Sequence, residues 1–334
     1  MSLAAYGFDS YWLHLYNSAD SPGTPGRVTG VDRGECDVAV EHGNARVRLG
    51  RHDVCTGDWV IVDDSSITAV LPRRTAIVRA SVGGTSDAQT LAANVDVVVI
   101  SVAADTGLDL GRIERYLALA WDSGARPLIV VTKCDKGFDM EDRISRVASA
   151  APGVEVFSVS AHFGDGMDQF TANLSGTIAL IGPSGSGKST LANSLLGAQM
   201  LSTGHVRQHD SKGRHTTVRR ELLALPAIGS TVIDTPGLRS VGLLSSDTGV
   251  QQTFSDIEEL ATQCRFNDCA HTTEPGCAVT EAVDARRIDS YHRLQRENRW
   301  ATTRHDIRAN QRRLTEAKQR SKLQRRMYKD RGQW

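Results

Sequence analysis

A glycine-rich stretch at residues 182–190, GPSGSGKST, has the residue types and spacing of a phosphate-binding loop. It follows the apolar run TIALI and precedes STLANSLLG, whose leucines recur at helical spacing. Glycines let the backbone turn several N–H groups toward an anion, and a following helix adds the positive end of its dipole. The pattern predicts Lys188 at the terminal phosphates of a nucleotide and Ser189 as a Mg²⁺ ligand. The predicted loop residues are Gly182, Pro183, Ser184, Gly185, Ser186, Gly187, Lys188, Ser189 and Thr190.

The motif DTPG at residues 234–237 ends a second apolar strand further along the chain. We expect Asp234 to hold Mg²⁺ through a water molecule and the backbone N–H of Gly237 to contact the γ-phosphate. Between the two motifs lies GRHTT, in which Thr216 or Thr217 is predicted to close over the γ-phosphate and complete the Mg²⁺ shell.

The residue after Gly237 is Leu238, at the place where Ras-like proteins carry the glutamine that orients the attacking water. An apolar side chain cannot orient water, so intrinsic hydrolysis is expected to be slow. His215 is the nearest candidate within the chain, because an imidazole can orient or deprotonate water. The alternatives are a group supplied by a partner, and a surface histidine without a role. The predicted catalytic residues are Lys188, His215 and Thr217.

The stretch TKCD, at the end of the apolar run PLIVV, has the composition of a guanine-recognition motif. An Asp carboxylate offers acceptors that match the imino and amino donors of guanine, whereas adenine presents the opposite pattern. The first position is Thr, where most GTPases have Asn, which predicts weaker nucleotide affinity. After the next strand, SVSA resembles the loop whose backbone N–H contacts the guanine oxygen. The predicted guanine-site residues are Thr132, Lys133, Asp135, Ser160 and Ala161.

The order of these motifs is unusual, because the guanine motif precedes the phosphate loop. A parallel sheet presents the loops that follow its strands at one edge, so one sheet can gather the motifs in any chain order. The order therefore predicts a circularly permuted P-loop GTPase, whose γ-phosphate-sensing loop leads directly into the C-terminal part of the chain.

Three of the six cysteines lie close together in CRFNDCAHTTEPGC, as C-x4-C-x-H-x5-C. Three thiolates and one imidazole form a closed tetrahedral shell that suits structural Zn²⁺. The alternative is a set of buried or redox-active cysteines. The predicted zinc ligands are Cys264, Cys269, His271 and Cys277.

Near-continuous apolar strands alternate with helical segments from residue 95 to 237, which predicts an α/β domain with a parallel sheet covered by helices. Five short alternating strands between 27 and 71 predict a small β-barrel of the oligonucleotide-binding (OB) type, although an SH3-like barrel fits the same pattern. Helix-prone, Arg-rich sequence follows the cysteines. We predict a barrel domain with an N-terminal extension over 1–80, the GTPase domain over 81–247, and a zinc-binding, mostly helical domain with a basic tail over 248–334.

The net charge of the 334 residues is zero, but it is distributed unevenly. Residues 303–334 contain eleven Lys/Arg and three Asp/Glu, so this tail carries +8 and the remainder −8. A basic tail on an acidic body indicates a polyanion such as RNA, or else a solvated tail without a partner. We find no secretory signal pattern and no apolar stretch long enough to span a membrane, and we expect a cytoplasmic monomer.

Together these motifs resemble the RsgA (YjeQ) family of ribosome small-subunit-dependent GTPases. The resemblance covers about residues 27–300 and rests on the motif order, GRHTT, DTPG followed by Leu, CRFNDCAHTTEPGCAV, QTLAANVDVVVI and RIERYLALAWDSGARPLIVVTK. It implies an OB barrel, a permuted GTPase and a zinc domain. It also implies GTP hydrolysis stimulated by the small ribosomal subunit during late maturation, with binding to the subunit and its rRNA in the GTP state and release after hydrolysis to GDP.

Two other functions remain compatible with the sequence. One is a nucleotide-dependent RNA-binding chaperone whose hydrolysis is incidental. The other is a metabolic P-loop kinase, although the sequence contains no recognisable acceptor site for a small molecule.

Overall fold

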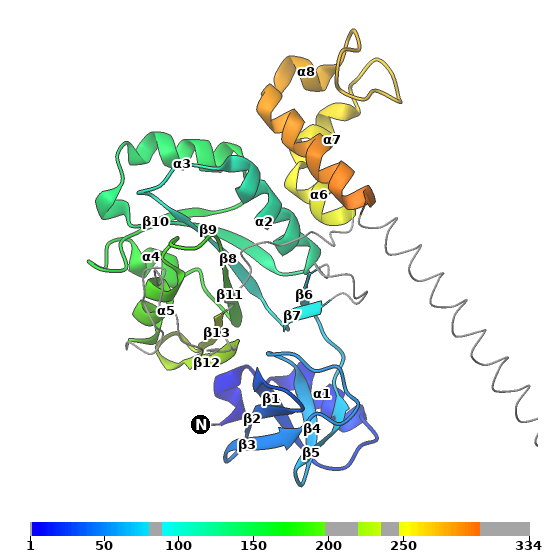
Figure 1. The fold of residues 1–334 in the computed structure, drawn as a ribbon, viewed down its shortest axis with the longest axis vertical. Helices are drawn as coiled ribbons and strands as arrows, with labels where there is room; N and C mark the ends of the chain where they lie inside the picture. Colours follow the sequence, from blue (N-terminus) through cyan, green and yellow to red (C-terminus); the bar gives the residue numbers. More distant parts are fainter. Residues whose placement is uncertain (1, 80–88, 198–219, 235–246, 301–334) are drawn as a thin grey trace, which may run out of the picture.

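The computed structural model describes residues 2–79, 89–197, 220–234 and 247–300 (Figure 1). The predicted residues His215, Thr216, Thr217 and Gly237, and the basic tail, lie outside these ranges. None of the helices within the described ranges is both long enough and apolar enough to cross a membrane.

The five predicted N-terminal strands form a closed barrel. The strands are β1 (Thr24–Val31), β2 (Glu35–Val40), β3 (Gly43–Arg48), β4 (Trp59–Asp63) and β5 (Ser66–Val70). They pair in the order β1-β2-β3-β5-β4, with β3 and β5 parallel, and β1 pairs with β4 to close the barrel. Alternating valines fill its interior, among them Val28, Val38 and Val47. The OB-type prediction is therefore confirmed.

An N-terminal segment packs against one side of this barrel. It comprises η1 (Leu3–Tyr6) and α1 (Ser10–Ser18), which begins at Asp9, whose carboxylate accepts the backbone N–H groups of Tyr11 and Trp12. The ring of Trp12 lies 5.6 Å from the buried Trp59.

The central part of the chain forms the predicted parallel sheet. Its strands are β8 (Val97–Ala103), β9 (Arg126–Thr132), β10 (Val156–Val159), β11 (Thr177–Ile181), β13 (Ser230–Asp234) and the antiparallel edge strand β12 (Glu221–Leu225). They are ordered β10-β9-β8-β11-β13-β12, and β12 continues the sheet into β1 of the barrel through the pair Glu221 and Gly30. Crossing helices separate the parallel strands, as the alternating pattern predicted.

Alternate residues of each parallel strand point to opposite faces of the sheet, and both faces are buried. On one face, Val98, Ile100 and Ile129 pack with residues of α2 (Leu110–Asp122) and α3 (Met140–Ser149). On the other, Val97, Val99 and Leu128 pack with α4 (Met167–Thr171) and α5 (Lys188–Leu196). This two-sided burial explains why the strands read as continuous apolar runs.

Three of the strands are absent from the sequence prediction. The strands β6 (Ala76–Arg79) and β7 (Gln89–Ala93) pair with each other and were not identified as strands. The segment that forms β12, ELLAL, consists of good helix formers and carries no strand pattern. Its pairing with β13 outweighs this local preference.

The C-terminal part is helical and packs against α2 (Figure 1). It contains α6 (Asp247–Thr253), α7 (Ser255–Ala261), α8 (Ala278–Ala282) and the helical segment 285–300. Gly249 of α6 makes a close approach, since a Cβ atom at this position would lie 2.3 Å from the carbonyl oxygen of Ala118 on α2. The two helices can therefore meet at this distance only with glycine at this point.

A buried charge network fixes the C-terminal helix to the GTPase domain. Glu114 of α2 is fully buried and accepts hydrogen bonds from the guanidinium groups of Arg286 (3.1 Å) and Arg287 (2.9 Å). Arg287 is also buried and donates to the carboxylate of Asp256 at 2.7 and 2.8 Å, and to the carbonyl oxygen of Ala150 at 3.1 Å. The network joins α2, α7 and the segment 285–300.

We predict that Glu114→Gln lowers the free energy of unfolding by about 3–5 kcal/mol, because it leaves the buried guanidinium group of Arg287 without the carboxylate that it shares with the exposed Arg286. Denaturant unfolding of the full chain measures the change. Glu141→Gln, at an exposed position on α3, is the matched control and is expected to change stability by less than about 0.5 kcal/mol. Equal effects of the two substitutions would contradict this role of the network.

Candidate nucleotide site and metal centre

The carboxyl ends of the parallel strands bring the predicted nucleotide motifs to one edge of the sheet. β9 ends at Thr132, β10 leads into Ser160, and β11 leads into the glycine-rich loop. The strands pair in parallel, so these three loops lie on the same side. The structure thus gathers segments that are about fifty residues apart in the chain.

The glycine-rich loop curls because three of its residues adopt left-handed backbone conformations that favour glycine. These are Gly182 (φ 144°), Gly185 (φ 79°) and Gly187 (φ 84°). Gly187 directly precedes α5, so the loop ends on the N-terminus of that helix. This is the backbone arrangement that binds phosphate groups.

Two buried hydroxyl groups orient the peptide between Ser186 and Gly187. The carbonyl oxygen of Ser186 accepts hydrogen bonds from Thr132 at 2.8 Å and from Ser101, at the end of β8, at 2.5 Å. A trans peptide directs its C=O and the following N–H to opposite sides. Because the carbonyl of Ser186 points toward Ser101 and Thr132, the N–H of Gly187 points away from them, to the side where we expect a phosphate.

This contact gives Thr132 a different role from the one its motif suggests. The side chain is 3 % exposed and its hydroxyl is engaged by the phosphate loop. Thr132 therefore positions the loop, and Ser101, which the sequence analysis missed, acts with it. A serine inside an apolar strand carries no recognisable signal in one sequence.

Lys188 folds back over the loop in this structure. Its ammonium group donates to the carbonyl oxygens of Gly182 (2.9 Å) and Pro183 (2.7 Å). The lysine thus lies across the mouth of the curled loop, within reach of any phosphate group bound there.

The guanine motif is held in place by Ser160. The Ser160 hydroxyl donates to Oδ1 of Asp135 at 2.6 Å, and this bond is the main reason that the pKa of Asp135 lies below its ordinary value. Asp135 itself is exposed and follows β9 in the short helix η2 (Cys134–Lys136). The carboxylate is thereby kept ionised and oriented, with Oδ2 available to a ligand.

Lys133 has an acidic partner that the sequence analysis did not identify. It adopts a left-handed conformation (φ 58°), and its ammonium group lies 2.9 and 3.1 Å from the two carboxylate oxygens of Asp105. Asp105 lies in the loop between β8 and α2, beside the guanine motif. The pair holds the lysine stem next to Asp135.

Asp234 is the last residue of β13, and its backbone is in register with Leu180 of β11, two residues before the glycine-rich loop. This places the predicted Mg²⁺ ligands Asp234 and Ser189 on segments that meet at the same edge of the sheet.

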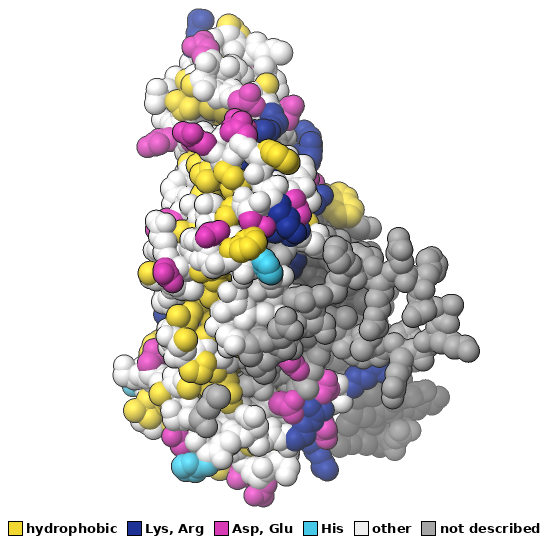
Figure 2. Space-filling view, turned by 90° about the vertical axis from the view of Figure 1, so that its left-hand side faces the viewer, with side chains coloured by type: hydrophobic (Ala, Val, Ile, Leu, Met, Phe, Trp, Pro, Cys, Tyr) yellow, Lys and Arg dark blue, Asp and Glu magenta, His cyan; other side chains and the backbone are white. Residues whose placement is uncertain are grey.

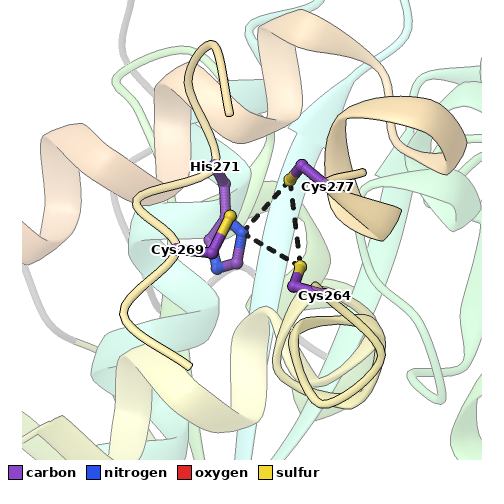
Figure 3. Close-up of side chains that lie close together, drawn as sticks. All are labelled: Cys264, Cys269, His271 and Cys277. Atoms are coloured by element: carbon purple, nitrogen blue, oxygen red, sulfur yellow. Dashed lines mark hydrogen bonds between the residues drawn. The ribbon is translucent and has the colours of Figure 1, made fainter. Parts of the chain in front are cut away.

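The four predicted metal ligands converge, as Figure 3 shows. Their ligand atoms all lie within 4.8 Å of one another. Nδ1 of His271 is 3.5 Å from Sγ of Cys277 and 3.7 Å from Sγ of Cys264, and these two sulfur atoms are 3.9 Å apart. A tetrahedron with metal–sulfur bonds of about 2.3 Å has edges of about 3.8 Å, so the cluster can hold a metal ion.

The environment of one of these thiols favours the thiolate form, which is the form that binds metal ions. Burial opposes ionisation of Cys277, but hydrogen bonds from Thr280 and His271 outweigh it and lower the pKa of the thiol to about 6. Cys277 also caps α8, with its sulfur accepting the backbone N–H of Thr280 at 3.4 Å. All six cysteines of the chain are free thiols in the structure.

Glu274 organises the loop that carries the ligands, and the sequence analysis missed this role. Its carboxylate accepts backbone N–H groups from Ala270 (3.1 Å), Thr272 (2.8 Å) and Thr273 (3.0 Å). These bonds, chiefly the one from Thr272, lower the pKa of Glu274 to about 2. His271 lies between the bonded residues, in a left-handed conformation (φ 56°). A carboxylate three residues before a ligand cysteine is too common a pattern to signal this role.

Comparison with known proteins agrees with this arrangement. The family model described as RsgA GTPase matches residues 70–244. A protein of Streptomyces avermitilis named small ribosomal subunit biogenesis GTPase RsgA is 50% identical, over 92% of this chain and 88% of the relative. This chain belongs to the RsgA GTPase family. A Streptomyces coelicolor protein of the same name is 48% identical over 92% of this chain and 90% of its own length.

Two solved structures share the RsgA-family fold. YjeQ from Thermotoga maritima superimposes with a TM-score of 0.59 at 23% identity, over 82% of this chain and 98% of that chain. YloQ, described as a circularly permuted GTPase, gives a TM-score of 0.59 at 21% identity, over 84% and 95% of the two chains. The predicted permuted fold is therefore confirmed.

We predict that Thr132→Val weakens GTP binding about fivefold, which corresponds to the ~1 kcal/mol of one lost hydrogen bond. Valine keeps the shape of threonine but no longer holds the Ser186 carbonyl. Titration with a fluorescent GTP analogue measures the affinity. Thr171→Val, which removes a hydroxyl bonded to the carbonyl of Asp168 on α4, is the control and should bind GTP normally. Unchanged affinity in Thr132→Val would contradict the role of this hydroxyl.

For the metal centre, we predict that Glu274→Ala lowers the affinity for Zn²⁺ about tenfold, because the loop around His271 loses its internal hydrogen bonds. Competition with a chromophoric chelator measures the affinity. Glu281→Ala removes the same charge from an exposed position on α8 and is expected to retain wild-type affinity. If both variants bind Zn²⁺ equally well, Glu274 does not organise the site.

Proposed function

We propose that this protein is a GTPase that binds the small ribosomal subunit and hydrolyses GTP during late maturation of that subunit. The observation that carries the proposal is the meeting of two motifs at one edge of the sheet. A carboxylate suited to guanine, Asp135, lies beside a phosphate-binding loop, and the Thr132–Ser186 contact joins the two. Membership of the RsgA GTPase family supports the same activity.

In the proposed site, Asp135 accepts the imino and amino hydrogens of guanine, Lys133 lies along the base, and Ser160 and Ala161 border it. The residues of the glycine-rich loop, from Gly182 to Thr190, surround the phosphates through their backbone N–H groups. Lys188 leaves the carbonyl oxygens that it now contacts and neutralises the terminal phosphates.

Mg²⁺ would neutralise charge on the β- and γ-phosphates, with Ser189, Asp234 and one of Thr216 and Thr217 as its ligands. We assign γ-phosphate sensing to the Gly237 backbone and water positioning to His215. Leu238 leaves no glutamine for that task, which fits an activity that depends on a partner.

We assign Zn²⁺ to Cys264, Cys269, His271 and Cys277. Three thiols and an imidazole without an open position suit a structural ion. Zinc would fix the loop 264–277, which has few apolar residues of its own, against α7 and α8.

Several features support the ribosomal partner. The relatives from both Streptomyces species are named for small-subunit biogenesis, and the chain has an OB-type barrel and a basic tail. On the face shown in Figure 2, acidic and basic side chains of the described residues are intermixed. RNA contacts on this face are therefore to be sought in local sites, and the basic tail adds positive charge. We place the protein in the cytoplasm, with domains over 1–80, 81–247 and 248–334.

The proposal predicts that purified small ribosomal subunits accelerate GTP hydrolysis by about tenfold or more, while ATP is not hydrolysed. Phosphate release with and without subunits measures the effect. A rate that subunits do not change would reject the proposal and favour an RNA-binding chaperone with incidental hydrolysis. Hydrolysis of ATP at a similar rate would favour a metabolic kinase or ATPase.

Three variants extend this experiment, and one of them is a control. Asp135→Asn should transfer the stimulated activity from GTP to xanthosine triphosphate, because the amide reverses the hydrogen-bonding pattern. Asp142→Asn, at an exposed position of α3, is the control and should not change the nucleotide preference.

His215→Ala is expected to lower stimulated turnover about a hundredfold if this histidine positions the water, and to leave it unchanged if the group comes from the subunit.

A further inference from the structure

A second polar pocket lies away from the nucleotide site, between the first turns of α2 and the helical segment 285–300. Its volume is about 140 Å³, several times the ~30 Å³ of one water molecule. Three arginines line it, Arg112 and Arg115 from α2 and Arg293 from the C-terminal segment. The pocket is thus built jointly by the GTPase domain and the C-terminal domain.

The arginines of this pocket are incompletely neutralised. Arg115 is paired with Glu297, and Arg112 lies 3.2 Å from Asp109 in an exposed ion pair, which contributes little energy. Arg293 has no hydrogen-bond or ion-pair partner among the residues that the structure describes. Nε of Arg115 is also buried without a partner. The site therefore has an excess of positive charge and of N–H donors.

The hydroxyl of Ser290, which lines the pocket, is a further hydrogen-bond donor. Ser290 is 6 % exposed, and within the described ranges its hydroxyl makes no hydrogen bond. It faces Gly111, where a Cβ atom would lie 3.7 Å from the Ser290 oxygen. Because Gly111 has no side chain, the space next to the Ser290 hydroxyl is open.

The only acidic side chain in the lining is already occupied. One carboxylate oxygen of Asp109 accepts the backbone N–H of Arg112 at 3.0 Å, and the other pairs with the guanidinium of the same residue. Among the described residues, the donors that remain without a carboxylate partner are the guanidinium group of Arg293 and the hydroxyl of Ser290, beside the exposed and weakly held Arg112. Guanidinium groups and a hydroxyl in this arrangement match the oxygens of a phosphate group.

The surroundings favour RNA over an acidic protein. Arg296 is exposed one helical turn beyond Arg293 on the same segment. Exposed guanidinium groups spaced along one helix suit the evenly charged backbone of a nucleic acid.

We infer that the pocket formed by Arg112, Arg115, Ser290 and Arg293 binds a backbone phosphate of ribosomal RNA. This inference rests on the proposed function and specifies one of its RNA contacts. Since the two walls belong to different domains, a phosphate bound here would also fix the C-terminal helix to α2.

The test measures binding of the full-length protein to purified small subunits, and to protein-free small-subunit rRNA, across a series of salt concentrations. The double variant Arg112→Gln/Arg293→Gln should bind both more weakly, with the slope of log K against log[salt] reduced by about 1. Arg146→Gln is the matched control, because Arg146 is a similarly exposed arginine paired with an acid on its own helix. It should behave as wild type.

A neutral substitution separates the pocket from general loss of charge. Gly111→Leu fills the floor without altering charge, and should weaken binding to both RNA and subunits while thermal unfolding shows an intact fold. Unstimulated GTP hydrolysis should be normal in all these variants, since none touches the nucleotide site.

Three outcomes would overturn the inference. In the first, the double variant binds as tightly as Arg146→Gln. In the second, it loses affinity for subunits but not for protein-free rRNA, and this result would indicate an acidic protein partner. Gly111→Leu could bind normally, which would exclude the cavity itself. In each case wild-type protein still binds subunits and is stimulated by them, whereas failure of the proposed function would abolish both.

Discussion

The nucleotide site depends on one small contact, the pair of hydroxyl hydrogen bonds to the carbonyl oxygen of Ser186. Ser101 and Thr132 come from adjacent parallel strands, and together they turn a single peptide so that its N–H faces the phosphate position. The same contact joins the guanine motif to the phosphate loop, so the two halves of the site are linked directly. It is a contact in space rather than along the chain, which is why the permuted order of the motifs does not impair it.

The permutation instead determines what the end of the GTPase domain is connected to. The strand that carries Asp234 is followed, after twelve residues, by α6, and Gly249 brings α6 against α2 at backbone distance. Glu114 and Arg287 also fasten α7 and the segment 285–300 to the same α2. A change at the carboxyl edge of the sheet is thus connected through a short stretch of chain to α6. A shift of α6 would disrupt its close contact with α2 at Gly249. This arrangement favours transmission to the C-terminal domain as a rigid unit.

Patterns that reflect local chemistry were predictable from the sequence, whereas contacts between distant segments were not. The phosphate loop and the four metal ligands are recognisable because their residues have fixed spacings. The parallel strands are recognisable because they are continuous apolar runs of typical strand length. Glu114 lies in an ordinary amphipathic helix, and nothing marks it as the partner of two arginines about 170 residues away. ELLAL forms the strand β12 because β13 offers an edge, which overrides a helical preference. Asp105 and Ser101 likewise acquire their roles only through neighbours in the folded sheet.

Thr132 illustrates how a substitution that looks unfavourable in a motif can be suited to its place. From the sequence, a threonine in place of asparagine removes an amide and predicts weaker binding. In the structure a short side chain suffices, because Gly187 lets the loop approach closely. A Cβ atom on Gly187 would lie only 3.0 Å from the Thr132 hydroxyl. The hydroxyl reaches the carbonyl oxygen of Ser186 directly, at 2.8 Å. The glycine and the threonine therefore form a matched pair, in which the missing side chain of one residue lets the hydroxyl of the other hold the phosphate loop.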